Sequence, residues 1–356
     1  MRSPPPSLPP SGSLGRRSAV LRITELFLAL PAALSFGASA GGALGITATN
    51  AGRSSSTLSM SSSDGVAVVG CGVLGTSLCR QLLENSHFGS RTVVGITKTP
   101  SRHEQIRSAV VGQAGGDVAD NERLQLLTSD DFASQQDAAK KFKDVVFCAP
   151  PSGFDDYPAA VRHAIEEYWD KDLGGCFVFT SSGGIYGQGS DGETVTETSP
   201  TADPATNPRT AKLVGAETAC REGGGCVLRL AGLYTLERGA HNYWLESGKD
   251  IQGRADGIIN LLHYDDAASA CMAAIEAGPA AVAGKTFLIS DSHPTTRLGI
   301  CESAIKAAKY AGKTIPPIVG GDDMPRGKIY DGSWSDVTLS WKPKYESFDK
   351  FMTSQS

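Results

Sequence analysis

Three glycines with the spacing of a dinucleotide-binding turn form the clearest chemical pattern in this chain. Gly70, Gly72 and Gly75 follow the apolar run 66–69 and open a helical run that continues through Leu82. In such a turn the first glycine allows the sharp bend, the second lets backbone amides approach a pyrophosphate, and the third lets helix and strand pack closely. We therefore expect dinucleotide contacts from Gly70, Cys71, Gly72, Val73, Leu74 and Gly75. A purely structural glycine turn is the alternative.

The residues after the next apolar run, 92–96, indicate which nucleotide binds. No carboxylate occurs from residue 85 to residue 103, whereas two cations and several hydroxyl groups do. An acidic residue at this place would bind the ribose hydroxyls of NAD, and cations accept the 2′-phosphate of NADP. We expect NADP, with NAD less favoured, and contacts from Thr97, Lys98, Ser101 and Arg102. A solvated helix start is the alternative interpretation.

A second polar group ends the apolar run 177–180. It contains Ser182 within the stretch 181–187, which is rich in serine and glycine. Open α/β sheets bind their ligands at the carboxyl ends of the strands, so Ser182 is expected to polarise a carbonyl or hydroxyl group beside the nicotinamide. Ala149 and Pro150 end the run before it and are expected to wall the cofactor cleft. A serine-rich turn without chemistry is the alternative.

The elements that must position these residues follow a regular order. From residue 66 onward, short β-branched runs alternate with longer helical ones, which is typical of a parallel sheet wrapped by helices. We predict an α/β fold: a doubly wound parallel Rossmann sheet over residues 64–230 and a smaller substrate-covering lobe over 231–356, which includes a strand at 286–290. The sheet strands are expected at 66–69, 92–96, 124–127, 145–148, 177–180 and 227–230. Its helices are expected at 75–83, 101–111, 133–142, 157–169 and 212–221.

Taken together, these motifs resemble the short-chain dehydrogenase/reductase superfamily. The similarity is to its extended and atypical branch, often labelled NAD-dependent epimerase/dehydratase, and covers residues 65–352. It also rests on the runs 228–234, 260–266 and 339–345. The resemblance implies an enzyme in which Ser182 orients the reacting oxygen.

One residue of that family's chemistry is missing. Its members carry a Tyr-x-x-x-Lys pair, in which tyrosine exchanges the proton and lysine lowers its pKa and holds the nicotinamide ribose. Matching the lysine to Lys212 puts Pro208 at the tyrosine position, and aligning on Glu217 puts Arg209 there. The resemblance leaves Lys212 as a ribose contact, with a surface helix lysine as the alternative. Substitute acids are Tyr186, one turn beyond the serine, and His241, His263 and Asp265 in the lobe. The alternative for His263 and Asp265 is that they tie the loop before a helix.

Two functions fit these residues. The first is an NADP-dependent oxidoreductase that acts on a small hydroxy or carbonyl compound, or an epimerase- or dehydratase-like enzyme. The second is a catalytically silent Rossmann protein that uses NADP binding for regulation or assembly. The missing tyrosine favours the silent protein, whereas the glycine loop and Ser182 favour the enzyme. A homodimer is compatible with both.

Composition narrows the range of partners. The 356 residues carry a net charge of −5, but residues 1–63 hold five arginines and one glutamate, so the rest of the chain carries −9. An acidic body repels phosphate backbones, and we expect no nucleic-acid binding. The eight cysteines contain no CxxC pair and the six histidines no paired-ligand spacing, so no metal site is expected.

The first 63 residues have the composition of a targeting leader. Arginines precede a short apolar stretch at 26–36 and an Ala-Ser-Ala run at 38–40, as in a signal peptide, and a hydroxyl-rich segment follows. The apolar stretch is too short to cross a bilayer, so no membrane anchor is expected. A disordered two-part leader of this kind, signal peptide then transit peptide, resembles those that address proteins to a plastid (chloroplast). A mitochondrial address, secretion and a tail with no address are the alternatives.

Overall fold

The computed structural model describes residues 64–112, 122–134, 141–187 and 191–356. The chain divides into two units, Met1–Thr57 and Leu58–Ser356, and every described residue belongs to the second. The expected targeting leader at 1–63 therefore lies outside the described residues, and its address and processing stay predictions.

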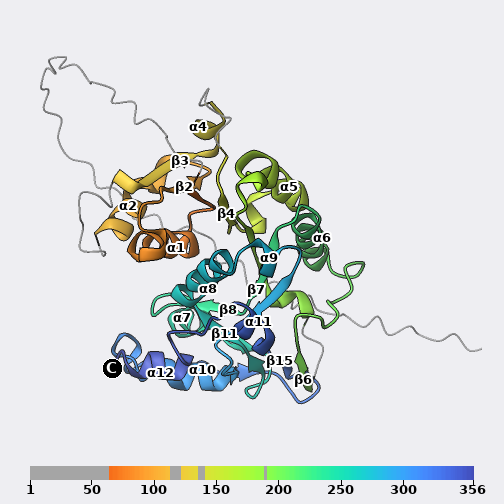
Figure 1. The fold of residues 1–356 in the computed structure, drawn as a ribbon. Coiled ribbons are helices and arrows are strands. Elements are labelled where there is room, and N and C mark those ends of the chain that lie inside the picture. Colours follow the sequence, from red (N-terminus) through yellow and green to blue (C-terminus); the bar gives the residue numbers. More distant parts are fainter. Residues whose placement is uncertain (1–63, 113–121, 135–140, 188–190) are drawn as a thin grey trace, which may run out of the picture. The chain divides into compact units, whose positions relative to one another are not determined.

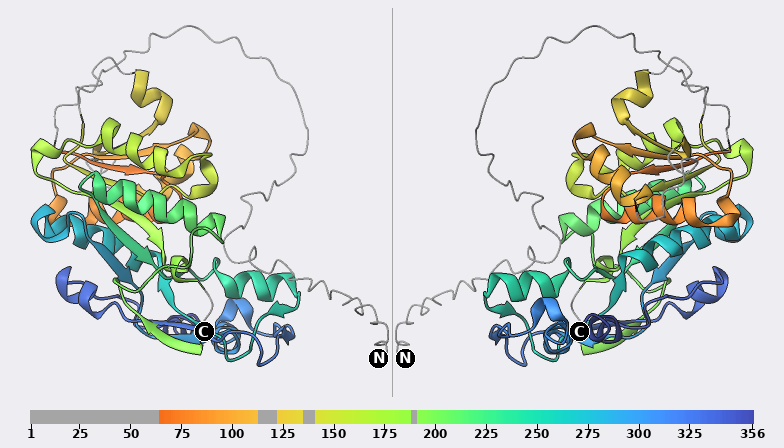
Figure 2. Two further views of the ribbon diagram at one scale, coloured as in Figure 1. Left: turned by 90° about the vertical axis from the view of Figure 1, so that its right-hand side faces the viewer. Right: turned by 90° about the vertical axis from the view of Figure 1, so that its left-hand side faces the viewer.

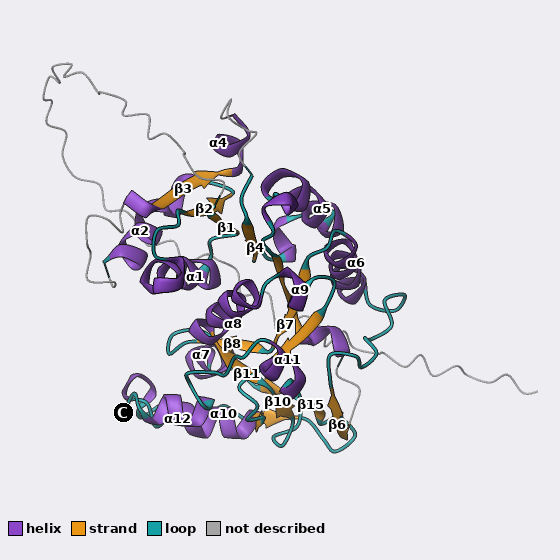
Figure 3. Ribbon diagram, viewed as in Figure 1, coloured by secondary structure: helices purple, strands orange, loops and turns teal. Residues whose placement is uncertain are grey.

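A seven-stranded parallel sheet forms the centre of the second unit, with the strand order β12-β7-β5-β4-β1-β2-β3 (Figures 1 and 3). The chain builds the sheet outward from β1 in one direction and then, from β4 onward, in the other. The order therefore reverses between β1 and β4, where sheets of this kind bind ligands. The strands are β1 (Val66–Val69), β2 (Val93–Thr97), β3 (Leu124–Thr128), β4 (Asp144–Phe147), β5 (Phe177–Ser182), β7 (Cys226–Leu230) and β12 (Thr286–Ile289).

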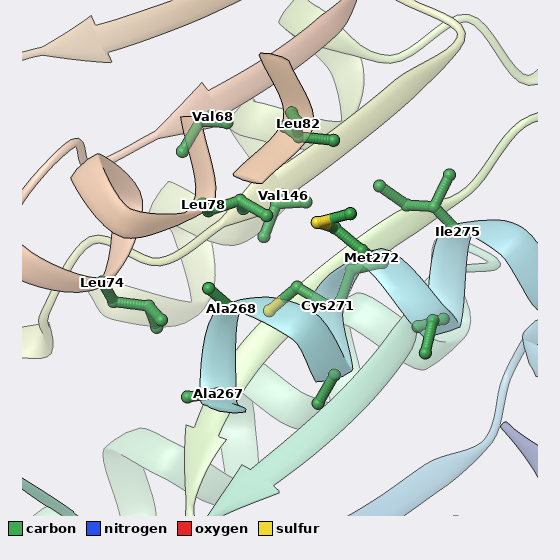
Figure 4. Close-up of a cluster of buried hydrophobic side chains, with 14 of the residues drawn as sticks. Val68, Leu74, Leu78, Leu82, Val146, Ala267, Ala268, Cys271, Met272 and Ile275 are labelled. Atoms are coloured by element: carbon green, nitrogen blue, oxygen red, sulfur yellow. The ribbon is translucent and has the colours of Figure 1, made fainter. Parts of the chain in front are cut away.

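Helices cover both faces of the sheet because its strands are apolar on both sides (Figure 2). In β1, Val66 and Val68 enter one core and Ala67 and Val69 the other, as the alternation of a strand requires. Figure 4 shows the first core, where leucines of α1 meet small side chains of α8. The first face carries α1 (Val73–Glu84), α2 (His103–Val111), α8 (Tyr264–Ala277) and α9 (Pro279–Val282). The second carries α5 (Tyr157–Tyr168) and α6 (Pro208–Glu222).

A third core, with buried residues between Tyr234 and Met352, packs together several of the smaller elements that follow β7. Their short strands form two-stranded pairs outside the main sheet, and the late strand β15 (Gly327–Tyr330) pairs with the early strand β6 (Asp191–Val195). The others are β8 (Gly232–Tyr234), α7 (Ala240–Ser247), β9 (Ile251–Gln252), β10 (Ile258–Ile259), β11 (Leu261–His263), β13 (Thr295–Thr296), α10 (Arg297–Ala304), β14 (Ile318–Val319), α11 (Ser333–Thr338) and α12 (Phe348–Thr353). Every helix of the described ranges falls short of the length and apolarity that a bilayer crossing needs.

The doubly wound parallel fold is confirmed, with two differences in its elements. The sheet gains a seventh strand, because β12 pairs with β7, so the sheet draws on the segment expected to form only the lobe. The helix expected at 133–142 is contradicted at its end. Residues 133 and 134 belong to helix α4 (Ser129–Ser134) and residues 135–140 lie outside the described ranges, but Phe142 forms a β-bridge with Trp169.

Candidate functional site

Gly70 turns the chain from β1 into α1. Its φ of +93° favours glycine, and a Cβ atom built on it would lie only 2.3 Å from the backbone nitrogen of Ala149. The Gly70 amide donates to the carbonyl of Ile96 at 2.9 Å. The turn is therefore held between the ends of β2 and β4. Ala149 lies against it, as expected of a cleft wall, and Pro150 is exposed beside it.

The other two glycines of the loop serve different purposes. A Cβ atom on Gly75 would lie 2.9 Å from the Gly70 carbonyl oxygen, so α1 packs closely against the turn. A Cβ atom on Gly72 would meet nothing closer than 3.9 Å, which leaves the start of α1 open. The amides of this first turn, including those of Val73 and Leu74, have no carbonyl four residues earlier within the helix. Free amides and the positive end of the helix dipole make the loop suited to a phosphate.

Two exposed cations lie at the end of β2. Within the described part of the chain, neither Lys98 nor Arg102 pairs with a carboxylate, and Arg102 Nε donates only to the side-chain oxygen of Gln105. The pKa of the Cys71 thiol is lowered mainly by a hydrogen bond from Cys79, with a smaller contribution from the charge of Arg102. This arrangement suits the 2′-phosphate of NADP.

The hydroxyl groups at the same strand end are already hydrogen-bonded. Thr97 Oγ1 lies 2.6 Å from Nε2 of His103, and Ser101 Oγ lies 3.0 Å from Thr99 Oγ1. His103 begins α2, and sequence reasoning did not select it. A single histidine at a helix start carries no signal of its own, and only the fold shows that its ring reaches back to Thr97.

Ser182 is the last residue of β5, paired in register with Leu230 of β7. It is half-buried, and its Oγ accepts a hydrogen bond from the Gly184 amide at 3.2 Å. The hydroxyl hydrogen remains available to a ligand, since that bond uses only a lone pair. Ser182 thus lies at the same carboxyl edge of the sheet as the glycine loop.

Tyr186 belongs to a buried network. Its hydroxyl donates to the carbonyl of Thr196 and accepts from Arg229 Nη1, both at 2.9 Å. Arg229 also pairs with Glu217 at 2.7 Å, and these two side chains are only 7% and 1% exposed. Burial is the main cause that raises the pKa of Tyr186. Its role as a substitute acid stays a prediction, and these contacts weigh against it.

An asparagine cap and a proline open α6 where the family's tyrosine would stand. Asn207 caps the helix by accepting from the amides of Arg209 and Thr210, and Pro208 occupies the first helical position, where its missing N–H costs nothing. Lys212 is exposed one turn later, and its role as a ribose contact stays a prediction.

A different tyrosine packs beside the serine. Tyr330, from β15, fills the space that a Cβ on Gly183 would need: its hydroxyl would lie 2.8 Å from that atom. Asn260 holds β15 in place, since its side chain accepts from the Tyr330 amide and donates to the Lys328 carbonyl. Among the described residues the Tyr330 hydroxyl has no hydrogen-bond partner. Sequence reasoning missed it because β15 lies far from Ser182 along the chain.

The three lobe residues considered as substitute acids have structural contacts. His241 Nε2 lies 3.1 Å from the carbonyl oxygen of Leu236, and burial lowers its pKa to about 4. His263 caps α8 by accepting from the Asp265 amide. The Asp265 carboxylate accepts from Ser77 and Arg80 of α1, and so ties α8 to α1.

A family model described as the NAD dependent epimerase/dehydratase family matches residues 66–290, more than half of the chain. The chain belongs to this family. A search of curated proteins finds no match. Membership in this family implies NAD(P) binding and an oxidoreductase- or epimerase-like class of enzyme. It also confirms the resemblance seen in the sequence.

Solved structures of other proteins share this family fold. UDP-glucuronic acid 4-epimerase from Bacillus cereus, in complex with NAD, has 18% identity and a TM-score of 0.61 over 82% of this chain and 95% of its own. dTDP-glucose 4,6-dehydratase from Bacillus anthracis, also with NAD, has 15% identity and a TM-score of 0.62 over the same shares. A functionally unknown protein from Silicibacter pomeroyi has 19% identity and a TM-score of 0.60 over 82% of this chain and 98% of its own. At these identities the likeness shows the fold alone.

The expected site residues fall into two groups. The glycine loop, the Thr97–Arg102 segment, Ala149 and Ser182 lie at the carboxyl ends of β1, β2, β4 and β5, which are neighbours in the sheet. Lys212 and Tyr186 belong to α6 and to the buried network. The first group can hold a dinucleotide, with one hydroxyl beside it for chemistry.

Proposed function

We propose that this chain is an NADP-dependent oxidoreductase that acts on a small hydroxy or carbonyl compound. The observation that carries the proposal is the end of β2, where Lys98 and Arg102 are exposed and have no carboxylate partner within the described residues. Cations without a competing acid at this place favour a 2′-phosphate over ribose hydroxyls. The two named enzymes among the neighbours were solved with NAD, so this strand end is where the present chain would differ from them.

Each part of the site has a distinct task in this proposal. A bound nicotinamide supplies hydride transfer. The amides of the glycine loop hold the pyrophosphate, and Lys98 and Arg102 hold the 2′-phosphate. Ser182 donates a hydrogen bond to the reacting oxygen and stabilises the negative charge that develops there.

Tyr330 is our candidate for the phenol that α6 lacks. Its ring lies against Gly183, the residue after Ser182, and burial is the main cause that raises its pKa. A raised pKa keeps the phenol protonated, so it acts as a hydrogen-bond donor and not as a base. Tyr330→Phe should lower kcat by about a hundredfold and leave the NADPH Kd unchanged. An intact kcat would leave Tyr330 with a packing role only.

The test of cofactor choice is a titration of the purified protein with NADPH and NADH, followed by nicotinamide fluorescence. NADPH should bind more tightly, and Lys98→Ala and Arg102→Ala should each weaken it by about tenfold, because each removes one charge-assisted contact in a partly wet site. Lys249→Ala, at an exposed position of the lobe, is the matched control. Equal affinities of the wild type for both nucleotides would refute the proposal.

A catalytically silent NADP-binding protein is the second candidate. The observation that favours it is Pro208 at the start of α6, where the family's tyrosine is absent. A panel of carbonyl and hydroxy compounds separates the two. NADPH binding without turnover on any compound would support the silent protein, and turnover would exclude it.

A further inference from the structure

Two cysteines meet directly beneath the candidate dinucleotide loop. Cys71 lies between Gly70 and Gly72, and Cys79 lies in α1, facing the core. Their Sγ atoms are 3.7 Å apart, and the residues are 4% and 0% exposed. Gly95 makes room for the first thiol, since a Cβ atom there would lie 3.2 Å from Cys71 Sγ.

The surroundings make the two thiols unequal. The pKa of Cys71 is lowered first by the hydrogen bond from Cys79 and also by Arg102, and Cys71 lies beside the positive N-terminus of α1. The pKa of Cys79 is raised by that same hydrogen bond and by burial. Thiolates are the reactive form of cysteine, so Cys71 is the nucleophile of the pair and Cys79 the resolving thiol.

We propose that Cys71 and Cys79 form a reversible disulfide that closes the glycine loop to the dinucleotide. The oxidant is a peroxide. The Cys71 thiolate attacks one peroxide oxygen, the O–O bond breaks, and a sulfenic acid and water form once the leaving hydroxide is protonated. Cys79 then attacks the Cys71 sulfur, the S–O bond breaks, and a second water leaves. Two thiols are oxidised and one hydrogen peroxide is reduced to two waters.

We infer that the bridge displaces the loop, which links it to cofactor binding. A disulfide brings its sulfurs to about 2.05 Å, much closer than the 3.7 Å between these thiols. Cys79 belongs to α1, which packs on the sheet and on α8, so we expect the Cys71 side to take up the change. Because Cys71 lies between Gly70 and Gly72, its displacement shifts both glycines. Gly70 already lies so close to Ala149 that a Cβ atom would not fit between them. The inference rests on the proposed function, since the amides that would move are those proposed to hold the pyrophosphate.

The experiment uses the full chain, first reduced and then treated with hydrogen peroxide. Alkylation and peptide mass spectrometry should find one new disulfide, between Cys71 and Cys79. The NADPH Kd should rise by about tenfold or more and return after dithiothreitol. NADPH bound beforehand should slow the oxidation. Cys79→Ser, or Cys79→Ala if the serine variant does not fold, should stop at a Cys71 sulfenic acid that dimedone traps.

Two matched variants serve as controls. Cys301→Ser, in the separate third core, should behave as the wild type. Cys148→Ser tests the other neighbouring thiol, whose Sγ contacts the Gly70 carbonyl at 3.2 Å, and it should leave the bridge intact.

Three results would overturn the proposal: no bridge at Cys71, a bridge from Cys71 to Cys148, or a Cys71–Cys79 bridge that leaves the NADPH Kd unchanged. Failure of the proposed function has a different signature. A reduced protein that binds neither nucleotide would refute the cofactor assignment and the switch together, whereas tight NADPH binding without the bridge would refute the switch alone.

Discussion

At the end of β2 two cations lie in solvent without a carboxylate partner among the described residues, whereas beside the end of β5 an arginine and a glutamate are buried as a pair. Lys98 and Arg102 belong to the first region, and Glu217 and Arg229 to the second. A buried charge needs its partner, and removing one member leaves the other uncompensated. A solvated cation contributes little to folding and is available to a ligand. We infer that the first region serves binding and the second holds the strand ends in place.

The largest effect should follow from breaking the buried pair. Arg229→Met leaves Glu217 with only Arg221, which is partly exposed and 3.3 Å away, and should lower the free energy of unfolding by about 3 kcal/mol, measured by urea denaturation. Arg102→Met is the matched control in the solvated region and should change stability by less than about 0.5 kcal/mol. Equal losses in the two variants would remove the distinction between the regions.

Ser182 tests the chemistry next to the buried pair. Once a substrate is found, Ser182→Ala should lower kcat about a hundredfold, because one positioned hydrogen-bond donor is lost from the transition state. The NADPH Kd should stay within about twofold, since the phosphates are held at other strand ends. Unchanged turnover would make Ser182 a turn residue and move the chemistry elsewhere.

Asp291 differs from Glu217 in that its carboxyl group is buried without a cationic partner among the described residues. It is 1% exposed, its Oδ2 has no hydrogen-bond partner among the described residues, and burial raises its pKa to about 7. The unfolded carboxyl ionises near its ordinary pKa, so stability falls as pH rises from about 4 towards 7. Relative to the wild type, Asp291→Asn should therefore gain about 2 kcal/mol between pH 5 and pH 8 in urea denaturation. A difference in free energy of unfolding between the variant and the wild type that is equal at both pH values would contradict the raised pKa of Asp291.

The sequence predicted best what depends on neighbouring residues. The glycine turn, the cationic end of β2 and the serine at the end of β5 each follow their strand directly, so strand periodicity and turn chemistry locate them. Six sheet strands could be placed for the same reason. The end of the helix expected at 133–142 was wrong because its polar pattern suits a helix, while the fold uses Phe142 in a bridge to Trp169.

What the sequence could not predict depends on contacts between distant segments. β12 joins the sheet beside β7 after an intervening stretch of lobe, and its register becomes visible only in the fold. Tyr330 reaches Gly183 in the same way, from a strand that Asn260 holds. The His103–Thr97 contact between α2 and β2 and the Cys71–Cys79 contact between the loop and α1 depend on side-chain direction, which spacing alone does not give.

A crystal structure of the full chain with bound NADP⁺ tests the central claim most directly, because it shows both regions at once. The account predicts the 2′-phosphate within hydrogen-bond distance of Lys98 and Arg102, the pyrophosphate at the first-turn amides of α1, and the nicotinamide beside Ser182. A 2′-phosphate that points into solvent away from both cations, or a nicotinamide remote from β5, would contradict it.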